Sequence, residues 1–231
     1  MKLIGIVGRC YYNRDNQEII QLNDALRKVL AKYMDVTSIL LLPTNKESYL
    51  ELGMSNDKIA DLDKEKLDYI LDKCDGFIVP GGTYWYNFDE YVIKYAINKK
   101  KPLLAICAGF QALCSMYALD RDKFDMTKRL EADSHYGKED EYIHECFINK
   151  NTLLANIINK EKIMVNSVHH DYVDFSMKDL IVSGISSDNI IEAVELENHP
   201  FLLGLQWHPE YLLDDNSIKI FDSFIDNIKK S

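Results

Sequence analysis

Short apolar runs alternate with segments of helical periodicity through the first half of the chain, and this alternation constrains the fold more than any other feature. Apolar runs of strand length lie at residues 3–8, 36–42, 76–82 and 102–106. Apolar residues recur at helical spacing in residues 18–33, 89–98 and 108–119, and in a further segment that begins at residue 63. Repeated strand–helix units predict an α/β fold, doubly wound, with a mostly parallel sheet and helices on both of its faces.

The second half of the chain has shorter apolar runs. Strands are expected at residues 142–148, 163–173, 180–185, 190–196 and 201–207, and a closing helix at 216–228. We therefore expect antiparallel strands to be added to the parallel sheet. No Pro-rich or Gly-rich linker divides the chain, which favours a single domain over residues 1–231.

Composition limits the partners and the compartment. A net charge of −10 disfavours non-specific binding to nucleic acid or to an anionic membrane. The 5 cysteines include no CxxC pair, so their spacing predicts neither a disulfide framework nor a zinc site. No apolar run approaches about 18 residues, which predicts no transmembrane helix, and the first residues fit a buried strand better than a signal peptide. We expect a cytoplasmic protein, with a homodimer as one candidate state.

A cysteine lies at the junction between the apolar run 102–106 and the helical pattern that follows it. At such a strand-to-helix turn the apex residue adopts a strained backbone conformation, and its side chain is lifted clear of the sheet. The small residues Ala105, Ala108 and Gly109 around Cys107 allow the strand and the helix to approach closely. The helix N-terminus favours a thiolate at the apex. Cys107 is therefore a candidate nucleophile, with a buried structural cysteine as the alternative.

A histidine and a glutamate two residues apart end another apolar run, in "LLGLQWHPEY", residues 202–211. Pro209 biases His208 toward extended backbone, and side chains at i and i+2 of an extended segment point the same way. Glu210 can therefore bind one ring nitrogen of His208 and leave the other free, which is the arrangement of a general base with its orienting group. A surface pair at a strand end is the alternative for this motif alone.

Two glycines follow a third apolar run, in "VPGGTY", residues 79–84. A backbone N–H of Gly81 or Gly82, together with that of Ala108, could form an oxyanion hole, whereas a plain Gly-Gly turn is the simpler interpretation. All three segments come at the ends of expected parallel strands, where functional groups gather. Together they would supply a nucleophile, a base with its orienting group, and oxyanion donors.

The motifs "PGG", "KPLLAICAGFQAL", "VNSVHHD" and "GLQWHPE" occur in the order and spacing of class I glutamine amidotransferase-like proteins. The chain most resembles the stand-alone γ-glutamyl hydrolases of the peptidase C26 type, the group that includes γ-glutamyl-γ-aminobutyrate hydrolase. This resemblance implies a flavodoxin-like fold. It also implies a triad of Cys107, His208 and Glu210 that cleaves a γ-glutamyl amide through a glutamyl thioester, releasing glutamate and an amine.

The same resemblance implies which residues bind the substrate. Gln111 would contact the glutamyl amino-acid end, and Ser167, His169 and His170 would line the same pocket. The adjacent histidines raise the question of a metal, but neighbouring residues on a strand point to opposite faces, so the pair is not expected to chelate one ion. We expect no metal and no organic cofactor, and a small γ-glutamyl molecule as the binding partner.

Two other functions stay open at the level of sequence. One is a glutaminase subunit that supplies ammonia to a separate synthetase, which would then be an obligatory partner. The other is a non-catalytic binding module on the same fold.

Two further segments each admit two interpretations. The aromatic stretch "TYWYNFDEY", residues 83–91, either walls the pocket or packs at the start of a helix capped by Asn87 or Asp89. In "EADSHYG", residues 131–137, His135 and Tyr136 either line the mouth of the site or belong to a solvated loop.

Overall fold

The computed structural model describes residues 1–44, 61–119, 128–129, 133–174 and 176–231 of the chain. Residues 131 and 132 of the "EADSHYG" segment therefore lie outside the described residues. No helix in the described ranges is both long enough and apolar enough to cross a membrane.

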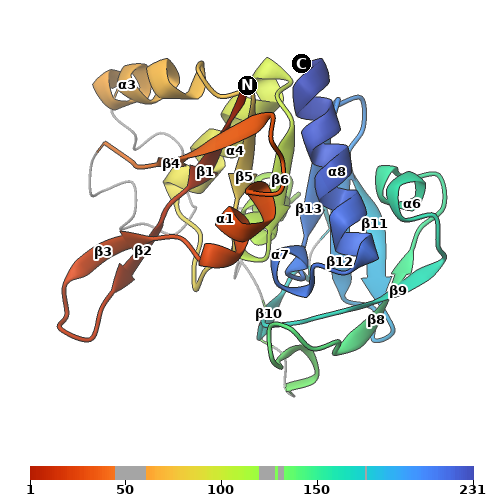
Figure 1. The fold of residues 1–231 in the computed structure, drawn as a ribbon. Coiled ribbons are helices and arrows are strands. Elements are labelled where there is room, and N and C mark those ends of the chain that lie inside the picture. Colours follow the sequence, from red (N-terminus) through yellow and green to blue (C-terminus); the bar gives the residue numbers. More distant parts are fainter. Residues whose placement is uncertain (45–60, 120–127, 130–132, 175) are drawn as a thin grey trace.

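A nine-stranded sheet forms the centre of the molecule, in the order β4-β1-β5-β6-β13-β12-β11-β8-β9 (Figure 1). The parallel strands are β1 (Lys2–Val7), β4 (Val36–Leu41), β5 (Gly76–Val79), β6 (Leu103–Ile106) and β13 (Leu202–Leu205). Taken in chain order, these five strands have the 2-1-3-4-5 arrangement of flavodoxin-like folds. The predicted fold class is confirmed.

Antiparallel strands extend the sheet beyond β13, as the shorter apolar runs predict. They are β12 (Ile191–Leu196), β11 (Leu180–Ser186), β8 (His144–Ile148) and β9 (Lys162–Val165). Two small two-stranded sheets pair β2 (Arg9–Tyr12) with β3 (Glu18–Gln21), and β7 (Lys128–Arg129) with β10 (Asp171–Tyr172). A short 3-10 helix, η3, covers Asp133–His135.

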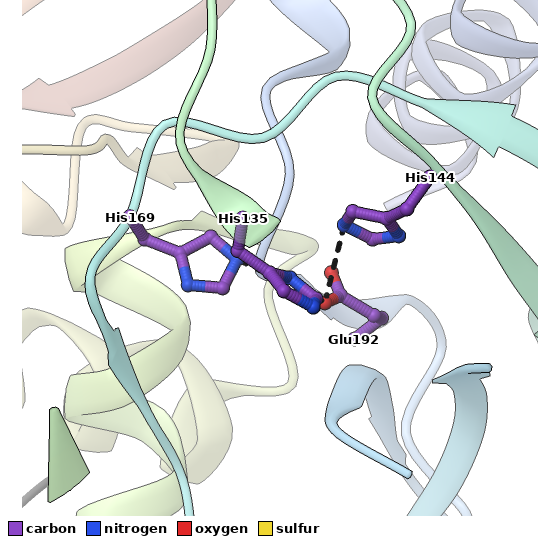
Figure 2. Close-up of side chains that lie close together, drawn as sticks. All are labelled: His135, His144, His169 and Glu192. Carbon is purple, nitrogen blue, oxygen red and sulfur yellow. Dashed lines mark ion pairs between the residues drawn. The ribbon is translucent and has the colours of Figure 1, made fainter. Parts of the chain in front are cut away.

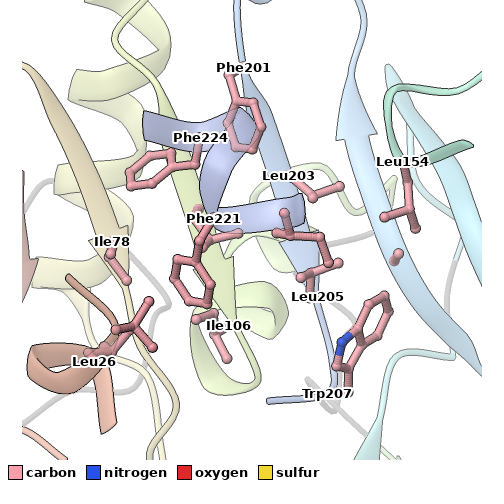
Figure 3. Close-up of a cluster of buried hydrophobic side chains, with 14 of the residues drawn as sticks. Leu26, Ile78, Ile106, Leu154, Phe201, Leu203, Leu205, Trp207, Phe221 and Phe224 are labelled. Atoms are coloured by element: carbon pink, nitrogen blue, oxygen red, sulfur yellow. The ribbon is translucent and has the colours of Figure 1, made fainter. Parts of the chain in front are cut away.

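Helices pack on both faces of the sheet and divide the core into two clusters of buried residues. One cluster joins the sheet to α1 (Asp24–Leu30), α6 (Leu153–Ile158) and α8 (Asp215–Lys230); the other joins it to α3 (Asp61–Leu71), α4 (Asn87–Lys99) and α5 (Ala108–Met116). Figure 3 shows the first cluster, where Phe224 of α8 packs against Phe201 with ring centroids 5.5 Å apart. The short helix α7 (Pro209–Leu212) precedes α8.

One predicted helix, over residues 18–33, is wrong in its first part. Residues 18–21 form β3, which pairs with β2 in a hairpin that projects from the sheet (Figure 1), and the helix α1 begins only at Asp24. The Asn13 side chain accepts the backbone N–H groups of Asp15 and Gln17 and so fixes the turn of the hairpin. Asn23 caps α1 by accepting from the backbone of Ala25.

Two boundaries in the second half also differ from the expected ones. The predicted strand 163–173 is divided, because β9 ends at Val165 and β10 begins at Asp171. Helix α6 was not predicted, although Thr152 supplies an N-cap whose hydroxyl accepts from the backbone of Ala155 at 3.0 Å. The segment between β9 and β10 carries the "NSVHH" residues, so its departure from strand geometry places them near the site.

Candidate active site

The turn from β6 into α5 places the Cys107 side chain at an apex. Cys107 has φ 50° and ψ −107°, outside ordinary helix or strand geometry. Its backbone N–H donates to the carbonyl of Leu205 in β13 at 2.7 Å. A β-carbon at Gly109 would lie 2.1 Å from the carbonyl oxygen of Val79, so only glycine allows α5 to start this close to β5. The strained elbow expected from the sequence is therefore present.

His208 and Glu210 follow β13, the neighbour of β6 in the sheet. The His208 Nδ1 atom lies 2.7 Å from Glu210 Oε1, and both residues are buried. Cys107 lies beside His208, close enough to influence the pKa of its imidazole. Burial lowers the pKa of the His208 imidazole, but the Glu210 carboxylate and Cys107 outweigh this effect, so its pKa is raised well above the ordinary value. The three side chains therefore lie next to one another in the order thiol, imidazole and carboxylate.

The glycine turn after β5 lies against both of these groups. A β-carbon at Gly81 would lie 2.5 Å from His208 Cε1 and 3.3 Å from Cys107 Cβ. Any other residue at this position would therefore fill the space beside the thiol and the imidazole. The turn's backbone thus borders the place where a carbonyl group would meet the thiol, which is where oxyanion donors are needed.

A buried arginine that the sequence did not single out holds this turn. Arg9 of β2 donates to the carbonyls of Pro80 and Gly81 and, through Nη1, to both carboxylate oxygens of Asp89 at 2.7 and 2.6 Å. Asp89 is fully buried and also accepts from the backbone N–H of Tyr86 at 2.8 Å. The hairpin β2–β3, the turn and the first turn of α4 are thereby joined. Arg9 lies outside every local motif, so no sequence signal indicated it.

Asn166 is a second functional position that sequence reasoning missed. Its side chain accepts from the backbone N–H of His208 and donates to the carbonyl of the same residue, both at 2.9 Å. The backbone of the candidate base is thus fixed by one fully buried amide. Asn166 is part of the "VNSVHHD" motif, which was the available signal, but only Ser167, His169 and His170 of this motif were expected to line the pocket.

These groups meet in a pocket of about 540 Å³. The sequence-predicted site residues that line it are Gly81, Gly82, Cys107, Gln111, His169, His170, His208 and Glu210. Gln111 donates to the carbonyl of Asp171 at 3.1 Å and to Gln206 Oε1 at 3.2 Å. Ala108 and Ser167 are buried beside the site and are not part of this lining.

The aromatic stretch 83–91 serves both of the roles considered for it. Tyr84 and Tyr86 line the pocket, whereas Trp85 and Phe88 are buried in the core. Asp89 caps α4 at its third position by accepting from the backbone of Tyr86. Contacts with a molecule in the pocket can therefore come from the tyrosines but not from the tryptophan.

The "EADSHYG" segment also divides between two environments. Tyr136 lines the pocket and stacks on His170, with ring centroids 4.2 Å apart. His135 points instead into a buried group with His144, His169 and Glu192, whose potential ligand atoms all lie within 4.8 Å of one another (Figure 2). Among the described residues, this group has the composition and spacing to hold a metal ion.

The comparisons with known proteins agree with this geometry. The family model described as peptidase C26 matches residues 85–210, a range that contains Cys107, His208 and Glu210. The γ-glutamyl-γ-aminobutyrate hydrolase of Escherichia coli strain K12 is 30% identical over 187 residues, which cover 69% of this chain and 74% of that enzyme.

Other similar proteins are parts of larger enzymes. The CTP synthase of Nautilia profundicola is 28% identical over 216 residues, which cover 77% of this chain but only 39% of that enzyme. The glutaminase domain of Trypanosoma brucei CTPS, solved with bound acivicin, has a TM-score of 0.68 at 17% identity and covers 100% of this chain and 95% of its own. This last likeness concerns the fold.

Proposed function

The chain belongs to the peptidase C26 family, and from this premise we propose that it is a cysteine-dependent hydrolase that cleaves γ-glutamyl amide bonds to glutamate and an amine. The observation that carries the proposal is the strained Cys107 elbow, whose thiol meets an imidazole that a buried carboxylate holds at 2.7 Å. A merely structural cysteine needs neither this backbone strain nor a buried base beside it.

The first half of the reaction forms a thioester. The thiolate of Cys107 attacks the γ-carbonyl carbon, and the carbonyl π electrons move to the oxygen, where the backbone N–H groups of Ala108 and of the turn at Gly81 or Gly82 stabilise them. The tetrahedral intermediate then collapses, the carbon–nitrogen bond breaks, and the imidazolium of His208 protonates the departing amine. The glutamyl group remains bound to the sulfur atom.

The second half releases glutamate. A water molecule gives a proton to the neutral His208 imidazole and adds to the thioester carbonyl, after which the carbon–sulfur bond breaks and Cys107 leaves as a thiolate. His208 is left protonated, as at the start of the cycle. Glu210 stabilises the imidazolium in each state in which it forms and keeps Nδ1 engaged, so that the other ring nitrogen serves the reaction.

Glutamate release from a panel of substrates tests this function. Purified protein is incubated with L-glutamine and with γ-glutamyl amides of larger amines, and glutamate and amine are measured separately. We expect glutamate and amine to be released in equal amounts, and acid quenching to trap an adduct of one glutamyl group on Cys107. In Cys107→Ala, both the product release and the adduct should be lost. A protein that releases no glutamate from any of these substrates and forms no adduct would instead be a binding module.

A second function is favoured by the CTP synthases among the relatives, which this chain matches over part of their length. In that case the same thioester chemistry would release ammonia from glutamine for a separate synthetase. Hydrolysis restricted to glutamine, together with a rate that rises when a co-purifying synthetase is added, would favour this role. Faster turnover of substituted amides by the isolated chain would favour the hydrolase.

A further inference from the structure

Three histidines and one glutamate converge in the interior from four separate parts of the chain (Figure 2). They are His135 of η3, His144 of β8, His169 between β9 and β10, and Glu192 of β12. The Glu192 Oε1 atom lies 3.2 Å from His135 Nδ1, 3.6 Å from His144 Nε2 and 3.8 Å from His169 Nε2. In a tetrahedral zinc site, bonds of ~2.0–2.1 Å place the ligand atoms about 3.3 Å apart, close to these separations.

None of the atoms that face the centre of this cluster has a hydrogen-bond partner. This applies to His135 Nδ1, His144 Nε2, His169 Nε2 and both carboxylate oxygens of Glu192. Glu192 is 0% exposed, His135 1% and His169 5%. A buried carboxylate that no donor satisfies is strongly unfavourable unless a cation compensates it. The cluster therefore has the properties of a cation site.

The outer nitrogen of each histidine is already engaged, and this fixes which atom faces inward. His144 Nδ1 lies 3.2 Å from the carbonyl of Glu145, and His169 Nδ1 lies 3.0 Å from the carbonyl of Asp171. A carbonyl only accepts, so both Nδ1 atoms carry hydrogen and both Nε2 atoms present lone pairs to the centre. His135 Nε2 lies 3.2 Å from both oxygens of Asp188. Carbonyl and carboxylate partners of this kind orient metal-binding histidines.

A proton alone does not satisfy these groups. A doubly protonated His135 would bridge Asp188 and Glu192 but would leave the inward nitrogens of His144 and His169 with no donor. One divalent ion accepts all three nitrogen lone pairs and one carboxylate oxygen at once. Imidazole with a single carboxylate suits Zn²⁺, and four protein ligands in a buried position are typical of a structural zinc site.

We propose that His135, His144, His169 and Glu192 bind one structural Zn²⁺ ion behind the wall of the active-site pocket. The two histidine-bearing segments pair through a bridge between Tyr136 and Val168 and a hydrogen bond from the backbone of His169 to that of His135 at 3.0 Å. Their inward residues reach the ion, and Tyr136 and His170 stack on the pocket side.

The proposal differs from the sequence expectation that no metal is bound. That expectation considered the adjacent pair at 169 and 170, and the two side chains do have different surroundings, because His170 stacks on Tyr136 while His169 lies in the cluster. The other three ligands come from residues distant in the sequence.

Metal content tests the proposal without any assay of activity. Untagged protein purified without chelator should contain about one zinc per chain by elemental analysis. Dipicolinate should remove the zinc and lower Tm, and added Zn²⁺ should restore both. Variants His144→Ala and Glu192→Gln should each hold at least tenfold less zinc. His170→Ala, next to a ligand, and Cys107→Ala, which removes the thiol of the active-site pocket, should keep it.

Cobalt substitution gives a readout that does not depend on the variants folding. The Co²⁺-loaded wild-type protein should show the visible bands of a tetrahedral ion without a thiolate charge-transfer band, because the ligand set contains no cysteine. Wild-type protein that takes up no stoichiometric Zn²⁺ or Co²⁺ would overturn the proposal in favour of a protonated histidine–carboxylate cluster. A thiolate band, or zinc lost in Cys107→Ala, would place the ion elsewhere and overturn it as well.

Discussion

Glu210 contacts the candidate base, His208, through one short hydrogen bond. The proposed reaction depends on the negative charge of Glu210, because this charge affects the pKa of His208. The carboxylate raises the pKa of His208 against the opposing effect of burial. A glutamine at position 210 keeps an oxygen for Nδ1–H but loses the charge, so the pKa of His208 should fall. The His208 imidazolium, which would protonate the leaving amine in the proposed reaction, would then deprotonate at a lower pH than in the wild-type protein.

We therefore expect Glu210→Gln to reduce kcat/KM about 10- to 100-fold and to move the alkaline limb of its pH profile to lower pH. Cys107→Ala should be more damaging, because it removes the covalent step itself. The measurement is hydrolysis of the best γ-glutamyl amide across pH, with the exposed Glu141→Gln as the matched control. An unchanged alkaline limb in Glu210→Gln would show that another group sets the protonation of His208.

The three residues of the proposed triad could be picked out from sequence because each lies in a local pattern. Small neighbours mark the elbow at Cys107, and the His-Pro-Glu spacing on extended chain places two side chains on one side. Arg9 lies in no such pattern, and the "VNSVHHD" motif that contains Asn166 does not show what its side chain contacts. Both residues act through backbone carbonyls and amides of segments far away in the chain, which only the folded structure brings into contact.

At the scale of elements, the site depends on how closely α5 approaches β5. A methyl group at Gly109 would meet the Val79 carbonyl oxygen at 2.1 Å, and backbone atoms of two packed elements have little freedom to move. We expect Gly109→Ala to reduce the free energy of unfolding by about 3 kcal/mol and to displace the thiol from His208, with a corresponding loss of activity.

Gly204→Ala is the control for this prediction. Its β-carbon would meet only side-chain atoms of Leu113, Val194 and Phe110, at 3.0–3.2 Å, and such contacts relax at a cost of about 1 kcal/mol. Denaturant unfolding of the two variants gives the comparison. Equal destabilisation would mean that α5 can shift along the sheet without strain.

Element boundaries were less predictable than element types. Ile19, Leu22 and Leu26 continue a helical spacing across the end of β3, so periodicity alone could not separate the hairpin from α1. The caps were stronger signals than the spacing: Asn23 begins α1, and Thr152 begins the unpredicted α6. The parallel strands β5, β6 and β13 were recovered because each is a continuous buried run.

At the scale of the whole molecule, the negative charge also reaches the pocket. The net charge is −10, and the lining contains Glu139 and Asp171 beside the Glu210–His208 pair, whereas its arginine, Arg9, is paired with Asp89. A negative field attracts cationic substrates and repels anionic ones, and salt screens both effects.

Substrates of the proposed reaction that differ only in leaving-group charge should therefore respond to salt in opposite directions. As ionic strength rises from about 20 to about 200 mM, kcat/KM should fall roughly two- to fivefold for a cationic leaving amine and rise by a similar factor for an anionic one. The neutral γ-glutamyl methylamide serves as the control. Parallel responses of all three substrates would show that the field does not reach the bound substrate.

The histidine cluster lay beyond sequence reasoning for a reason that belongs to the whole molecule. Its members come from η3, β8, the segment between β9 and β10, and β12, so their meeting depends on the antiparallel pairings at one end of the sheet. In the sequence, only the adjacent pair His169 and His170 raised the question of a metal, and only His169 lies in the cluster.

The paired segments around Tyr136 and Val168 have one further consequence. Along these segments the buried His135 and His169 join the interior cluster, with His169 also at the edge of the pocket, whereas Tyr136 and His170 stack on the pocket side. Heritable change at the pocket-side positions can therefore alter which molecule the pocket accepts while the interior positions stay constant. In evolutionary terms, the pocket-side positions of these segments are free to diverge, whereas the neighbouring interior positions are constrained.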